Sequence, residues 1–156
     1  MKKIITILAS ALVLSAVAFA QPKAVGVRGG LLNLGQISYE HWLGEPHFLE
    51  AELGVTSYKD NNVGFDITGL YNLTIYRPDW TVDGEWGLYV GVGGNLGAGY
   101  DSDASKSKAY ISLAAQVGLE YTFDFPLQVS LDYRPYFFGL DGFRSSLALG
   151  IRYAFR

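Results

Sequence analysis

The segment SSLALGIRYAF, residues 145–155, alternates between two kinds of side chain along its whole length. Large apolar residues such as Leu149 and Ile151 occupy every second position, and the residues between them, such as Gly150 and Arg152, are small or polar. Alternation with a period of two is typical of a β-strand with one apolar face. The segment therefore predicts a strand whose two faces meet different environments.

The same alternation recurs in seven earlier segments, and no helical period of 3.6 residues is visible after Gln21. Turn-forming residues such as Gly, Pro, Asn and Asp occur between the segments. We therefore predict an all-β fold in which eight antiparallel strands close into an up-and-down barrel. The predicted strands span residues 24–32, 35–43, 48–57, 63–76, 86–100, 111–123, 127–137 and 145–155.

The first twenty residues have the three parts of a secretory signal peptide. Two lysines precede an uncharged apolar run, and Ala18-Phe19-Ala20 supplies small residues where a signal peptidase needs them. The apolar run is shorter than the roughly 20 residues of a membrane-spanning helix. We predict cleavage before Gln21 and export by the general secretory pathway, which divides the chain into a signal peptide (1–20) and a barrel (21–156).

The composition excludes several classes of protein. The chain contains no cysteine, which rules out a disulfide framework and a lipid anchor on cysteine. Its formal net charge of −3 argues against nucleic acid as a partner. Aromatic residues make up 15% of the chain and glycine contributes 19 residues, and membrane barrels use both types heavily.

The two faces of the predicted strands indicate which side of the barrel wall meets lipid. Eight strands leave an interior just wide enough for side chains to fill, and charges inside it must be paired. The apolar faces carry almost no charge over the roughly 10 residues that a tilted strand needs to cross a bilayer. We therefore predict an eight-stranded antiparallel transmembrane β-barrel with a polar lumen. The predicted lumen ionic network comprises Arg28, Glu40, Glu50, Glu52, Asp66, Glu120, Asp132, Arg134 and Arg152. Within it, the three arginines are expected to pair with the glutamates and with Asp132.

Connections and aromatic residues suggest how the barrel is oriented. We predict short periplasmic turns at 43–47, 81–85 and 124–126, and mostly longer exterior connections at 58–62, 101–108 and 139–144. Tyr and Trp favour membrane interfaces, so two aromatic girdles are expected at the strand ends. The predicted periplasmic girdle comprises Trp42, Tyr76, Trp80, Trp86, Phe123, Phe125 and Phe155, and the exterior girdle comprises Tyr58, Tyr100, Tyr110, Phe137, Phe138 and Phe143.

Five short motifs are spread over the chain after residue 20. They are Val27-Arg28-Gly29-Gly30, Thr68-Gly69-Leu70-Tyr71, Gly118-Leu119-Glu120-Tyr121, Leu131-Asp132-Tyr133-Arg134-Pro135 and Gly150-Ile151-Arg152-Tyr153-Ala154-Phe155. Through them the chain resembles small outer-membrane β-barrel proteins of the OmpA/OmpX architectural type, and among these an outer-membrane β-barrel domain family of unassigned activity. The resemblance implies a porin-like architecture in a Gram-negative outer membrane.

The same resemblance implies partners. They are outer-membrane lipid including lipopolysaccharide, with periplasmic chaperones and the barrel-assembly machinery acting during biogenesis, and the barrel is expected to be a monomer. The C-terminal motif looks like the signal that this machinery reads, with Gly150, Tyr153 and Phe155 in the signal positions. It departs from that signal by ending on Arg156 and by placing Ala148 where a polar residue is usual.

Three functions remain open at the level of sequence. A structural or surface-interaction barrel is preferred, a narrow pore for ions or small solutes is second, and an outer-leaflet lipid-modifying enzyme is third. His41 and His47 are the only histidines and flank a predicted periplasmic turn, where a catalytic base cannot reach the outer leaflet. We expect no catalytic, cofactor or metal site. Asp101, Asp103 and Asp141 are read as solvated loop acids, and Gly91, Gly93 and Gly94 as barrel-packing glycines with no helix after them to hold a nucleotide.

Overall fold

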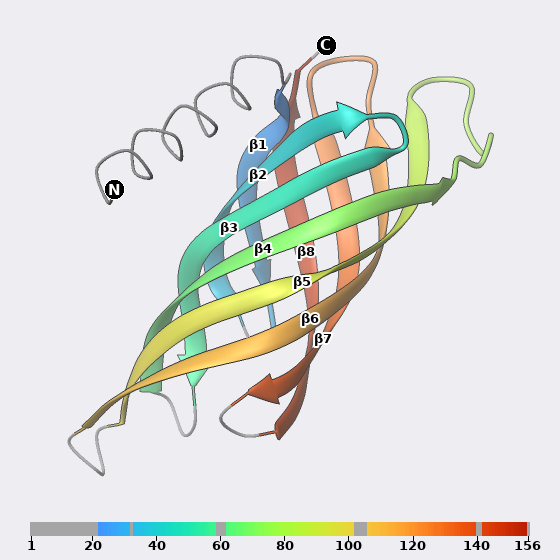
Figure 1. The fold of residues 1–156 in the computed structure, drawn as a ribbon. Coiled ribbons are helices and arrows are strands. Elements are labelled where there is room, and N and C mark those ends of the chain that lie inside the picture. Colours follow the sequence, from blue (N-terminus) through green and yellow to red (C-terminus); the bar gives the residue numbers. More distant parts are fainter. Residues whose placement is uncertain (1–21, 32, 59–61, 102–105, 140–141, 156) are drawn as a thin grey trace, which may run out of the picture.

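The protein is described by a computed structural model over residues 22–31, 33–58, 62–101, 106–139 and 142–155. The predicted signal peptide lies outside these residues. Eight strands form one closed barrel (Figure 1). No helix in the described part of the chain is long and apolar enough to cross a membrane. The strands are β1 (Pro22–Gly30), β2 (Asn33–Gly44), β3 (His47–Tyr58), β4 (Asn62–Tyr76), β5 (Glu85–Asp101), β6 (Lys106–Thr122), β7 (Gln128–Gly139) and β8 (Gly142–Ala154).

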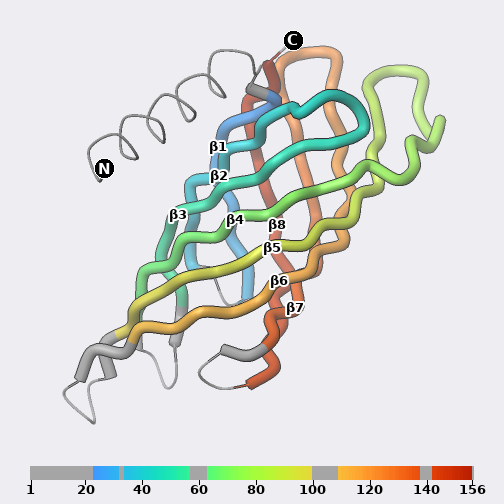
Figure 2. Tube along the Cα trace, in the orientation of Figure 1, coloured from blue at the N-terminus to red at the C-terminus, as the bar shows by residue number. Residues whose placement is uncertain are grey.

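The strands pair in sequence order, and every pairing is antiparallel. The barrel closes where β1 pairs with β8, with Val25 opposite Tyr153. The start of β1 and the end of β8 therefore lie at the same end of the barrel, called here the terminal end (Figure 2). The predicted all-β, eight-stranded antiparallel barrel is confirmed, and the predicted strands match the observed ones to within a few residues at most ends.

The lengths of the connections contradict the sequence prediction. At the terminal end the strands are joined by residues 45–46, 77–84 and 123–127, and at the opposite end by 31–32, 59–61, 102–105 and 140–141. The longest connection thus lies at the terminal end, where short turns were expected. One reason is that polar residues predicted as an exterior loop belong to the wall, because β5 and β6 stay paired as far as Asp101 and Lys106.

The polarity of the barrel is the reverse of that of a water-soluble protein. Side chains that point into the lumen are mostly polar or charged, and Arg28 and Arg134 are only 1% and 0% exposed. Side chains on the outside are mostly large and apolar, and Phe65 and Ile111 are each 68% exposed. Leu70, Ala114 and Tyr136 form a small cluster of buried apolar residues inside the barrel, and the buried rings of Phe48 and Tyr89 pack with their centres 5.5 Å apart. Most of the interior is therefore held by hydrogen bonds and ion pairs.

Candidate functional site

The central part of the lumen is built around Arg134 of β7. Its guanidinium donates hydrogen bonds to Glu52 of β3 and to Gln116 Oε1 of β6, the latter at 2.6 and 3.0 Å. β3 lies across the barrel from β7, so the contact with Glu52 crosses the lumen, whereas Gln116 belongs to the neighbouring strand. Planar guanidinium and carboxylate groups pair well in this two-pronged way, which suits a site with no room for water around each charge.

Arg28 of β1 forms a second contact inside the lumen, which reaches past the neighbouring strand β8 to β7. Its guanidinium donates two hydrogen bonds to Asp132 of β7 and a third to Gln36 Oε1 at 2.8 Å. Arg28 Nε also lies 3.4 Å from Glu52 Oε1, which links it to the group held by Arg134. The two arginines and two acids therefore form one connected cluster in which each charge has an opposite charge beside it.

Arg152 of β8 organises the next part of the network toward the terminal end. It donates to Glu50 Oε1 at 2.6 Å, to Ser130 Oγ at 2.6 Å and to Ser38 Oγ at 2.9 Å. It also lies 3.3 Å from Glu40 Oε1. A Cβ atom on Gly150 would come within 2.8 Å of Arg152 Nη1, so glycine at that position leaves room for the guanidinium.

Lys23 forms the part of the network nearest to the terminal end. Its ammonium donates to Glu40 at 2.9 Å and to Glu120 at 2.6 Å. It also lies 3.9 Å from the ring centre of Phe48 and 5.2 Å from that of Trp42, within the range of a cation–π contact. Carboxylates and ring faces together surround this ammonium group.

A β-bulge brings Lys23 into the lumen. Pro22 pairs with His41 and Ala24 pairs with Glu40, so Lys23 is an extra residue on β1 opposite two consecutive residues of β2. As a result Lys23 and Ala24 are both buried, although adjacent residues of a regular strand face opposite sides. Sequence reasoning missed Lys23 because the predicted strand began at residue 24, and unbroken alternation counted back from Arg28 would place Lys23 on the outer face.

All nine residues of the predicted lumen network are buried inside the barrel. The three arginines contact Glu40, Glu50, Glu52 and Asp132. Glu120 is instead bound by Lys23 and by Gln128 Nε2, the latter at 2.5 Å. Asp66 lies nearer the opposite end and accepts hydrogen bonds from Gln36 at 3.1 Å and from Asn95 at 2.8 Å.

A cavity of about 520 Å³ opens at the terminal end of the lumen. Its walls include Lys23, Trp42, Glu120 and Gln128 from the strands. Arg77 and Val82 come from the long connection 77–84, and Asp124 comes from the connection 123–127. The unexpectedly long connection 77–84 and the short connection 123–127 therefore both border the mouth of the barrel.

Aromatic rings form a continuous row on the outside of the terminal end. Trp80, Trp86, Tyr121, Phe123 and Phe125 follow one another with ring centres 4.6 to 5.3 Å apart. The predicted assembly-signal residues Tyr153 and Phe155 are also exposed there, with ring centres 5.1 Å apart. At the other end Phe137 and Phe143 pack together at 5.6 Å.

Two aromatic residues assigned to the girdles face the lumen instead. Ser38 and Glu40 of β2 point into the lumen, and Trp42 is the next residue at the same two-residue spacing. Its ring lies near Lys23. Tyr110 lies over Gly97, an inward position of β5. Both were assigned from their place near a strand end alone, whereas strand alternation decides which face a ring occupies. The side chains of Tyr58, Tyr100 and Phe138 lie outside the described residues.

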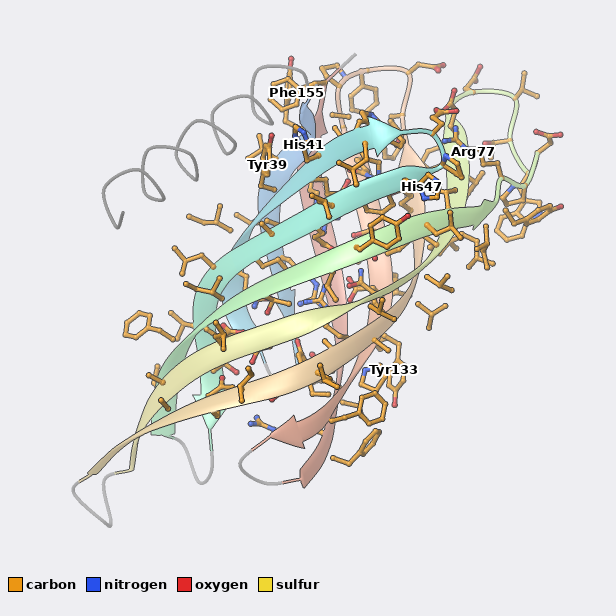
Figure 3. The ribbon with its side chains drawn as sticks, in the orientation of Figure 1. Tyr39, His41, His47, Arg77, Tyr133 and Phe155 are labelled. Atoms are coloured by element: carbon orange, nitrogen blue, oxygen red, sulfur yellow. The ribbon has the colours of Figure 1, made fainter. Side chains whose placement is uncertain are left out.

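The two histidines lie on the outer surface near the terminal end, as Figure 3 shows. His41 Nδ1 is 2.8 Å from the hydroxyl of Tyr39, and His47 Nδ1 is 2.6 Å from that of Tyr71. Arg77 lies at the same end and pairs with Glu45 at 3.0 Å (Figure 3). Both histidines are therefore on the face opposite to the ionic network.

Among the described residues, no group of three or more His, Asp or Glu side chains is arranged to hold a metal ion. The side chains of Asp101, Asp103 and Asp141 lie outside that part of the chain. Comparison with known protein families, curated proteins and solved structures finds no match. The barrel and the chemistry of its two faces are therefore the features that bear on function.

Proposed function

We propose that the protein is an outer-membrane β-barrel with a structural or surface-interaction role and no catalytic activity. The observation that carries this proposal is the inverted polarity of the wall. Leu, Ile, Val, Phe and Tyr side chains cover the outside of all eight strands, while charged groups fill the inside. Exposed apolar surface on this scale is unfavourable in water and favourable in lipid.

The lumen chemistry supports a structural role over conduction. Arg134, Arg28, Arg152 and Lys23 each reach an acid on a strand that is not their neighbour, so side chains cross the lumen at successive levels. Eight-stranded barrels have room for little besides such side chains. A wall tied together through its interior suits a rigid platform in the membrane.

The positions of the histidines support the non-enzymatic part of the proposal. His41 and His47 point away from the lumen, and each is bonded to a tyrosine hydroxyl. A hydrolase of the outer leaflet would need a base near that leaflet, in reach of a nucleophile and a carboxylate. With the terminal end in the periplasm, both histidines would lie at the wrong side of the membrane for this chemistry.

A narrow pore is the alternative that one observation favours. The lumen is polar along much of its length and widens into the cavity at the terminal end. Solute passage would require the cross-lumen ion pairs to separate, so we expect conductance that is very small or absent.

We further propose that the partners are outer-membrane lipids including lipopolysaccharide, with periplasmic chaperones and the barrel-assembly machinery during biogenesis, and that the barrel is monomeric. The assembly machinery would read Tyr153 and Phe155 on the outside of β8, where both rings are exposed. Replacing both residues with serine should lower the amount of barrel in the outer membrane while refolding in detergent is retained.

Four measurements test the proposed function. Cell fractionation should recover a chain that begins at Gln21 in the outer membrane, and recovery from the inner membrane of a chain that begins at Met1 would contradict export. The refolded protein should migrate differently on detergent gels with and without boiling, because a closed barrel resists opening. Planar bilayers and lipid A turnover assays should show no clear channels and no product. Stable channels would favour the pore, and turnover would favour the enzyme.

A further inference from the structure

The cavity at the terminal end has the chemical features of a binding site. Its volume of about 520 Å³ lies within the roughly 300 to 1,000 Å³ that small-molecule sites occupy, and the mouths of β-barrels are a common place for them. Polar strand residues form its inner part, and the connections 77–84 and 123–127 border its outer part. The ionic network described above occupies the lumen beyond it.

Gln128, which lines the cavity, carries a buried acceptor atom that has no partner among the described residues. Gln128 is 1% exposed and donates through Nε2 to Glu120 at 2.5 Å. Since this hydrogen bond directs the amide nitrogen toward the carboxylate, the oxygen Oε1 is free to accept, and it has no partner among the described residues. A buried carbonyl oxygen without a donor is unfavourable, so a ligand that supplies an N–H group would satisfy it.

The charges around the cavity favour a cation over an anion. Three acids, Glu85, Glu120 and Asp124, line it together with only two bases, so the lining carries a net negative charge. Lys23 is held by Glu40 and Glu120, and Arg77 lies 3.0 Å from Glu45 and 3.5 Å from Glu85. Deeper in the lumen the described buried side chains include more acids than bases, so the local field also favours positive charge.

The protein already holds one ammonium group in this region. Lys23 Nζ is surrounded by two carboxylates and by the faces of Phe48 and Trp42, and Trp42 also lines the cavity. This contact shows that the local groups can replace the water around an ammonium ion. We propose that the cavity binds a small aliphatic primary amine, whose ammonium group is held by Gln128 Oε1 and the acids that line the mouth.

Calorimetric titration of the refolded protein in detergent micelles with n-butylammonium chloride tests this proposal. We expect saturable binding, accompanied by a change in tryptophan fluorescence because Trp42 lines the cavity. Sodium butyrate has an alkyl chain of similar length and the opposite charge, and should not bind. Equal heats for butylammonium and butyrate would indicate partition into the micelle and would overturn the proposal.

Two variants and one matched control locate the site. Gln128→Leu removes the unused acceptor and should weaken butylammonium binding about tenfold or more, as expected for a buried hydrogen bond to a charged group. Asp124→Asn removes one lining charge while keeping an oxygen to accept from Gly84 N, and should weaken binding about two- to fivefold. Asp79→Asn removes an exposed acid of the connection 77–84 that does not line the cavity, and should leave binding unchanged.

The comparison between Asp124→Asn and Asp79→Asn separates a specific site from a general effect of net charge, because each variant loses one negative charge. Equal weakening in both would overturn the proposal. Unchanged binding in Gln128→Leu would also overturn it, provided that the unboiled variant keeps the gel mobility of the folded barrel. If Gln128→Leu does not fold, the two surface variants still decide the outcome.

Discussion

The inner and outer faces of the barrel wall consist of the same strands but depend on different kinds of interaction. On β8, Arg152 points inward and contacts Ser38, Ser130, Glu40 and Glu50, each at a defined distance. Its neighbour Ile151 points outward and is 47% exposed. An inward charge therefore needs particular partners, whereas an outward residue needs only to be apolar. The effects of substitutions on the two faces should therefore differ in size, and in how strongly they depend on the chemistry of the new side chain.

The largest effect is expected where an inward charge is removed. Arg152→Leu leaves Glu50 buried without its closest cation and should lower the free energy of unfolding by about 3 to 5 kcal/mol. Urea titration in lipid vesicles measures this change. Leu149→Val, on the outward face of the same strand, is the control and should cost far less. Equal costs would mean that the two faces of β8 do not differ in the way described.

A charge placed on the outer face should have the next largest effect, provided that this face meets lipid. Leu131 is 49% exposed on β7 and pairs with Leu149. Leu131→Lys should cost up to about 2 to 4 kcal/mol in vesicles, because a charge on a face that meets lipid is poorly solvated. Val82→Lys, on a fully exposed connection residue, should cost nothing measurable. A stability unaffected by Leu131→Lys would contradict the lipid-facing proposal.

Substitutions at two adjacent glycines of β5 allow the two faces to be compared without any change of charge. A Cβ atom on Gly93 would lie 2.0 Å from the carbonyl oxygen of Gly69, whereas one on Gly94 would meet only Ser112 O at 3.6 Å. Gly93→Ala should therefore cost about 1 to 3 kcal/mol from crowding against the backbone. Gly94→Ala should be neutral or slightly stabilising. Thermal unfolding followed by circular dichroism distinguishes the two, and the reverse order would show that β4 and β5 are not as close as described.

The smallest effect is expected for an ion pair outside the lumen. Arg77 contacts Glu45 and Glu85, but its side chain is 40% exposed. Arg77→Gln should change the free energy of unfolding by less than about 1 kcal/mol, and added salt should reduce the difference because exposed charges are screened. Urea titrations at low and high salt test this. A loss as large as that in Arg152→Leu would mean that water does not screen this pair.

The barrel could be predicted from sequence because alternation with a period of two survives in every strand. The same pattern identified the inward acids and arginines, since each lies on the polar face of a segment with regular alternation. Lys23 was missed because the bulge between Pro22 and Ala24 shifts the alternation by one residue. A bulge of this kind depends on pairing with β2, which no pattern within β1 reveals.

The connections and aromatic rings were predicted less well, for a related reason. The residues 101–108 are rich in Asp, Ser and Lys and look like a loop, yet the backbone of β5 and β6 continues its hydrogen bonds through part of them. Trp42 was placed by its distance along the chain, whereas its inward direction follows from the register of β2. The cavity depends on several connections meeting in space and has no signal in the linear sequence.

The pairing of β1 with β8 has a consequence for the order of folding. Val25 finds its partner Tyr153 only when nearly the whole chain is present, so the first strand cannot complete its hydrogen bonds during synthesis. Hairpins such as β5–β6 can form early because their residues are close in sequence, whereas closure of the ring must overcome the entropy of joining the two ends. Until that step, β1 and β8 both carry an unpaired edge that can join another chain. The last strand therefore completes the fold and at the same time removes the two edges through which unfinished barrels would aggregate.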